Sequence, residues 1–130
     1  MELLEIHDQI RSLRSKGEYG EAFLKIIDYE KSGGALSAYL LIMKGDLIQL
    51  TDDLDFTLQD AVRCYMSAVE LEPKNIEAHE ELGWLYFNVL GEPESAKNWF
   101  ERALVLAKER VSKIEEGLTR CEEQSTPNHD

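Results

Sequence analysis

The sequence predicts an all-α fold made of three consecutive helical hairpins. Apolar residues recur every three to four positions through most of the 130 residues, which is the period of an amphipathic helix. Short segments rich in glycine, proline or aspartate interrupt this period and divide the chain into six helical segments. No segment shows the apolar–polar alternation of a half-buried strand. We expect one domain over residues 1–123 and a disordered tail over residues 124–130.

Glycine delimits the first hairpin. An apolar stripe over residues 3–13 predicts the first helix, and after a glycine-containing turn the stripe resumes at Ala22. The Ser-Gly-Gly segment at residues 32–34 ends the second helix, since glycine commonly terminates helices. The first hairpin therefore extends over about residues 3–34.

The second hairpin contains an acidic loop and a capping motif. Residues 35–50 are almost continuously apolar and predict the third helix, whereas residues 51–56 are acidic and predict a loop. Thr57 followed by Asp60 resembles a capping box, with aspartate in place of the usual glutamate or glutamine. The fourth helix then runs to about Leu71.

Proline and a long apolar seam define the last two helices. Pro73 stops the fourth helix, Asn75 can cap the fifth, and Pro93 suits the first position of the sixth. No strong helix breaker follows, so we expect the sixth helix to continue unbroken past Lys108 as an extension over residues 109–123. Its apolar positions step by three and four residues on one helix face, and they are Leu104, Ala107, Val111, Ile114, Leu118 and Cys121.

Charge and cysteine content narrow the class of protein. The formal net charge is −12, which disfavours nucleic acid and anionic membrane surfaces, because both need a basic patch. Cys64 and Cys121 fit neither a disulfide framework nor the paired spacing of a zinc site, so we expect reduced thiols. The N-terminus has no signal-peptide pattern, and no apolar run approaches the length of a membrane span. These features predict a cytoplasmic protein.

The three hairpins repeat one another. Small residues occur at Ala22, Ala61 and Ala96, 39 and 35 residues apart, and a larger residue follows each of them by four positions. In the third hairpin, residues 79–86 read His-x2-Leu-Gly-x2-Tyr and residues 96–100 read Ala-x3-Phe. This pattern resembles the tetratricopeptide repeat (TPR), W-x2-L-G-x2-Y followed by A-x3-F and proline, whose unit has 34 residues.

The match to the TPR pattern differs among the three units. The third unit has histidine in the aromatic position and Lys108 in place of the closing proline. The second unit matches through Gly45, Ala61, Tyr65 and Pro73, with an inter-helix loop about four residues longer that resembles Sel-type repeats. The first unit carries the fewest matching positions.

The resemblance implies a right-handed α–α superhelix of three hairpins, over residues 3–34, 35–75 and 76–108, with the extended C-terminal helix as a cap. In the TPR family the first helix of each pair lines a concave groove that contacts the ligand. In the first unit of this chain that face corresponds to His7, Arg11 and Arg14. In the second and third units it corresponds to Tyr39, Ile42, Asp46, Gln49, Glu77, Glu80, Trp84, Phe87 and Asn88.

The sequence contains no recognisable catalytic or metal-binding motif. His79 has no second histidine one turn away, so it does not form an HExxH zinc site and is interpreted as a half-buried helix residue. Cys64 is interpreted as a core cysteine. The aspartates at 52, 53 and 55 lack the glycine and closing glutamate of a calcium-binding loop. We expect a protein that is not an enzyme and uses no cofactor or metal.

The groove composition predicts a basic protein partner. Residues 17–91 contain 14 acidic and 5 basic residues. Glu77 and Glu81 stand where chaperone-tail-binding TPR proteins have lysine and arginine, and two carboxylates would repel an acidic tail. Trp84 and Phe87 among carboxylates are typical of interface anchors, although both could instead pack on the sixth helix.

Two functions fit these expectations. The first is a protein–protein interaction module that binds a basic segment in an acidic, aromatic groove, as a toxin-neutralising immunity protein or a specialised chaperone would. The alternative is an oligomeric scaffold or assembly factor that pairs through the seam residues Val111, Ile114 and Leu118. Two or three heptads are short for an independent coiled coil, so a monomer with an intramolecular cap is favoured over a homodimer.

Overall fold

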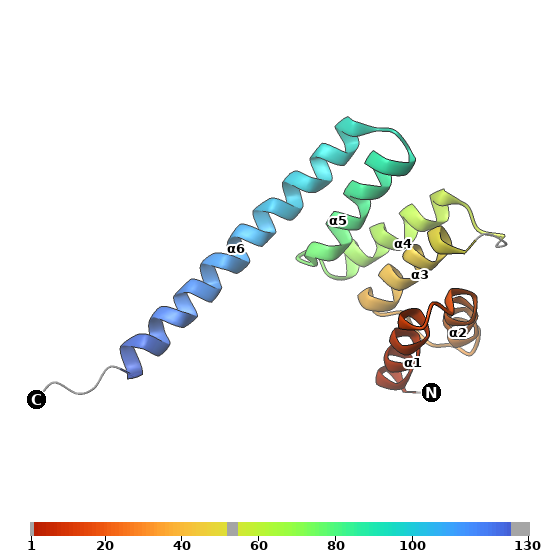
Figure 1. Cartoon of the computed structure of the whole chain (residues 1–130), viewed down its shortest axis with the longest axis horizontal. Helices are drawn as coiled ribbons and strands as arrows, with labels where there is room; N and C mark the ends of the chain where they lie inside the picture. The colour runs from red at the N-terminus through yellow and green to blue at the C-terminus, as the bar shows by residue number, and fades with distance from the viewer. Residues whose placement is uncertain (1, 52–54, 126–130) are drawn as a thin grey trace, which may run out of the picture.

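The computed structural model describes residues 2–51 and 55–125, and within these ranges the regular structure is entirely helical (Figure 1). In chain order the elements are α1 (Leu3–Ser15), α2 (Tyr19–Lys31), α3 (Ala38–Leu50), α4 (Leu58–Leu71), α5 (Ile76–Trp84), the π-helix η1 (Leu85–Val89) and α6 (Pro93–Ser125). Helices α1 and α2, α3 and α4, and α5 and α6 pack on each other, and α2–α3 and α4–α5 contacts join the pairs. The prediction of an all-α fold is confirmed for the described residues.

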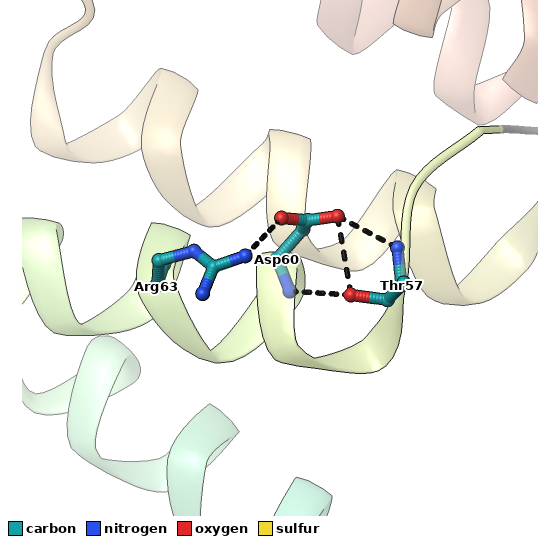
Figure 2. A network of polar contacts seen from close by, with 3 residues as sticks. All are labelled: Thr57, Asp60 and Arg63. Carbon is teal, nitrogen blue, oxygen red and sulfur yellow. Dashed lines mark hydrogen bonds and ion pairs between the residues drawn. The ribbon is translucent and has the colours of Figure 1, made fainter.

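The predicted capping box at the start of α4 is confirmed (Figure 2). The Asp60 backbone N–H donates to Thr57 Oγ1 at 3.3 Å, and the Thr57 backbone N–H donates to Asp60 Oδ2 at 2.7 Å. Arg63, one turn further on, pairs with the other carboxylate oxygen of Asp60. The hydrogen bond from the Thr57 backbone and the interaction with Arg63 both lower the pKa of the Asp60 carboxyl. Aspartate therefore serves here in the place usually taken by glutamate.

Other helix ends also follow local sequence signals. The Ala78 backbone N–H donates to Asn75 Oδ1 at 3.0 Å, and α6 begins at Pro93, as predicted. Helix α2 ends at Lys31, and Gly33, two residues further on, has a φ of 93°, in the left-handed region that glycine adopts without strain. The acidic loop predicted for residues 51–56 falls in part on 52–54, outside the described residues.

Two glycines let paired helices approach closely. Gly45 of α3 lies against the ring of Tyr65 on α4, and Gly83 of α5 lies against the ring of Phe100 on α6. A Cβ atom at either position would come within 2.6 Å of the facing ring, closer than real Cβ contacts allow. Tyr65 is fully buried, so its ring fills the space that the absent side chain of Gly45 leaves open.

Helix α6 continues without a break at Lys108, as predicted. Its first half packs on α5 and buries Ala96 and Ala103, whereas every residue of the segment 108–125 is exposed and the helix projects away from the other helices (Figure 1). The expectation that the apolar seam caps the hairpins is therefore wrong. The physical reason is length: α5 begins at Ile76, so α6 continues beyond the helix that covers its first half.

The π-helix η1 was not predicted, because the sequence pattern indicates an ordinary helix through Tyr86. The Leu90 N–H donates to the Leu85 carbonyl at 3.0 Å, five residues earlier, instead of four as in an α-helix. The segment therefore contains one more residue in its turn than an α-helix would.

Candidate functional site

Charged side chains from three helices meet at one place. Asp46 lies on α3, Glu77 and Glu81 lie on α5, and one carboxylate oxygen of each lies within 4.8 Å of the other two. We call these three residues the acidic cluster. Arg14 of α1 borders the cluster, with Nη1 at 3.3 Å from Asp46 Oδ2. A shallow groove of about 200 Å³ opens here, lined by Arg14, Asp46, Gln49, Leu50 and Glu81.

Asp46 is the buried member of the acidic cluster, with 6% of its surface exposed. The Tyr65 hydroxyl donates to Asp46 Oδ1 at 2.6 Å and accepts a hydrogen bond from Gln49 Nε2 at 2.7 Å. Arg14 approaches the second oxygen of Asp46 and also donates to the sulfur of Met43 at 3.2 Å. A buried carboxylate is tolerated when it is paired and hydrogen-bonded, and Asp46 meets both conditions.

The two glutamates of the acidic cluster both have raised pKa values. Burial, the charge of Asp46 and a hydrogen bond to Asp46 raise the pKa of Glu81 to about 8. Partial burial and the charge of Asp46 also raise the pKa of Glu77, which is the more exposed of the two. Arg14 opposes both shifts, but it is a single positive charge facing three carboxylates. The acidic cluster is therefore short of positive charge.

The groove residues predicted from the sequence fall into separate groups. Asp46, Gln49 and Glu77 lie in or beside the acidic cluster, and Glu81, which the sequence prediction of groove residues omitted, lies at its centre. Tyr39 lies elsewhere, against His7 at 4.6 Å between ring centroids and under the Arg11 guanidinium. A carboxylate at Glu81 was visible in the sequence, but Asp46 and Arg14, which interact with it, come from other helices.

The prediction that Ile42 contacts a partner is wrong. Ile42 is 1% exposed and belongs to the hydrophobic core, so its side chain is not presented to a partner. The reason lies in α3, which is apolar on nearly every side and is covered by both α2 and α4. The helical period therefore could not distinguish the groove face of α3 from its core faces.

Trp84 and Phe87 lie in an apolar groove against α6. The Trp84 ring packs edge-on to Phe100 at 4.8 Å between centroids and to Phe87 at 6.5 Å. Both remain about half exposed and, together with Leu104 of α6, line a groove of about 620 Å³. Trp84 therefore packs on the sixth helix, as the alternative interpretation expected. Glu80 and Asn88 are exposed.

Cys64 and His79, whose side chains could react or bind a metal if they were accessible, are both buried. Burial raises the pKa of the Cys64 thiol to about 11, so this thiol stays protonated at neutral pH. His79 is 4% exposed, with Nδ1 2.8 Å from the Asn75 carbonyl oxygen and its ring 5.7 Å from that of Trp99. Both residues therefore contribute to packing in this structure.

A comparison with protein-family models gave no match, and a comparison with curated proteins also gave none. Among the described residues, no helix is both long enough and apolar enough to cross a membrane.

Proposed function

We propose that this protein binds a protein partner by holding a lysine or arginine side chain of that partner against the acidic cluster. The observation that carries this proposal is the convergence of three carboxylates, from α3 and α5, at a groove where Arg14 is the only cationic side chain among the described lining residues. A cationic side chain placed there would gain several oxygen acceptors at once. It would also relieve the repulsion among the carboxylates.

The surroundings of the acidic cluster suit such a side chain. Leu50 lines the same groove and offers apolar contact to the methylene stem of a lysine or arginine. Tyr65 and Gln49 fix the orientation of Asp46, so the deepest carboxylate is already held in place before a ligand arrives. The net charge of −12 would attract a basic segment over a longer range.

A TPR-like arrangement of the helices also supports a groove-binding function. The two glycine–aromatic contacts, Gly45 with Tyr65 and Gly83 with Phe100, occupy equivalent places in the second and third hairpins. The interval of 35 residues between Ala61 and Ala96 exceeds the TPR unit by one, and η1 accounts for one extra residue within that interval. We therefore propose a TPR-like solenoid whose first helices supply the acidic cluster, on α3 and α5, and the bordering Arg14, on α1.

Titration with a hexalysine peptide tests this function. Cation binding must compete with the proton on Glu81, so we expect the affinity to rise by roughly tenfold between about pH 6 and pH 8.5, after allowance for solvent screening. Higher salt should weaken the binding. Isothermal titration calorimetry at several pH values and salt concentrations measures both effects, with hexaglutamate as the peptide control.

A matched pair of variants locates the binding. Glu81→Gln removes a carboxylate of the acidic cluster, and Glu70→Gln removes an exposed one on α4. We expect Glu81→Gln to weaken hexalysine binding, increasingly so as the pH rises, and Glu70→Gln to have a small effect at every pH. Equal effects of the two substitutions, or an affinity that does not depend on pH and salt, would show that the acidic cluster is not the binding site.

A further inference from the structure

No other part of the chain that the structure describes buries the distal half of α6, although Lys74 and Ile76 line a shallow pocket beside Ile114. Every residue of 108–125 is exposed, and Val111, Ile114 and Leu118 are 53%, 63% and 59% exposed. In proteins, most of the stability of a helix comes from packing of its amphipathic face against other elements. An apolar seam along one face of such a helix indicates a surface that another helix covers.

We propose that a second copy of this chain covers the seam, and that the two α6 helices pair antiparallel over residues 104–121. This register places every seam residue opposite another seam residue. The facing pairs, each taken between the two copies, are Val111 with Ile114, Ala107 with Leu118, and Leu104 with Cys121. Each pair recurs on the other side of the two-fold axis, so the 18 residues, about 27 Å of helix, form six layers.

The charges of α6 favour the antiparallel direction. In residues 108–113 the basic side chains Lys108, Arg110 and Lys113 outnumber the single acidic one, and in residues 115–123 four glutamates outnumber the single Arg120. Antiparallel helices bring the basic half of one copy against the acidic half of the other, whereas parallel helices would place like halves side by side. The complementarity of this segment is thus with itself, which is the reason for choosing a second copy as its partner.

Local geometry flanking the seam fits the same pairing. Lys108 and Glu115 each follow a seam residue by one position, so in the antiparallel register Lys108 of one copy lies close to Glu115 of the other. Leu104, the first residue of the seam, also lines the apolar groove formed with Trp84 and Phe87, so the seam meets that groove at one end.

Sedimentation velocity of the full chain tests the pairing. We expect a concentration-dependent dimer for the natural sequence and a dissociation constant at least roughly tenfold larger for Ile114→Glu. Val105→Glu is the matched control, because Val105 lies on α6 with 57% exposure but outside the seam, and this variant should dimerise like the natural sequence. Circular dichroism of both variants shows whether the fold is retained. A natural chain that is monomeric throughout the micromolar range overturns the proposal.

Cysteine crosslinking tests the antiparallel register separately. In Leu104→Cys, mild oxidation with oxidised glutathione should join Cys121 to the new cysteine of the second copy, as mapped by peptide mass spectrometry. The natural chain should give little crosslink between its two Cys121 residues, which the antiparallel register holds about 25 Å apart along the helix. Efficient crosslinking of Cys121 to Cys121, or equal crosslinking from Val105→Cys, contradicts the register. Cys64 is buried and unreactive, so it does not interfere.

Discussion

Replacing Glu81 by glutamine changes the charge of the acidic cluster while keeping its shape, and we expect this variant to be more stable than the natural protein at alkaline pH. The folded protein raises the pKa of Glu81 from 4.5 to about 8. Across that interval the folded state binds the proton more tightly than the unfolded chain does. The resulting stabilisation is complete below about pH 4.5 and is lost as the pH rises through about 8. Glutamine stays neutral at every pH, and its amide can donate to Asp46 as the protonated carboxyl does.

The separation of the carboxylates sets the magnitude. Two unit charges 4.8 Å apart repel by about 3.5 kcal/mol at an effective dielectric constant near 20, and by about 0.9 kcal/mol in bulk water. Glu81 is only half-buried, so solvent screens its interactions and Arg14 offsets part of them. We therefore expect the natural protein to lose about 1–2 kcal/mol relative to Glu81→Gln between about pH 5 and pH 9.

Urea denaturation at these two pH values measures the free energy of unfolding. The natural protein and Glu81→Gln should have similar stability near pH 5 and should differ near pH 9, with the variant more stable. Glu70→Gln controls for the change in net charge, since Glu70 is exposed on α4. If the difference between Glu81→Gln and the natural protein is the same at both pH values, the carboxylates do not repel one another as the geometry requires.

Four further substitutions test the packing and capping, each measured by urea denaturation at neutral pH. Gly45→Ala should cost about 1–3 kcal/mol, because its Cβ meets the buried ring of Tyr65, and an unchanged stability would mean that the ring moves freely. Gly117→Ala, with open space around it in α6, should instead stabilise by about 0.5–1 kcal/mol. Tyr65→Phe should cost about 1–3 kcal/mol, since it leaves buried Asp46 without one hydrogen-bond donor; a neutral effect would refute this role. Thr57→Ala should cost about 1 kcal/mol by removing the cap of α4, and no loss would show that the capping box is dispensable.

The features of the fold that the sequence predicted correctly are local. The caps at Thr57 and Asn75, the start of α6 at Pro93 and its passage through Lys108 each depend on a few neighbouring residues. A capping side chain reaches a backbone N–H only three residues away, so its effect hardly depends on the rest of the fold. Such signals are therefore readable without knowledge of how the helices pack.

The features that the sequence could not predict are those that several helices create together. Asp46 is buried because Tyr65 from α4 and Arg14 from α1 reach its two oxygens, and neither distance follows from spacing along the chain. Glu81 belongs to the acidic cluster for the same reason. The exposed seam of α6 shows the converse case. Its apolar period was visible, but the expectation of a cap failed because the short helix α5 does not bury the seam residues Val111, Ile114 and Leu118.

The stability prediction and the binding proposal rest on the same charge. A fold selected for stability alone would gain from glutamine at position 81, since three carboxylates beside one arginine oppose folding at neutral and higher pH. Destabilising charge arrangements of this kind are typical of binding and catalytic sites, where stability is given up for function. If Glu81→Gln stabilises the protein above pH 8 and at the same time weakens hexalysine binding, one carboxylate accounts for both effects, as a ligand site requires. If it stabilises the protein and leaves hexalysine binding unchanged, the acidic cluster lowers the stability of the fold but does not bind the peptide. The site for the partner's cation would then lie elsewhere on α1, α3 and α5.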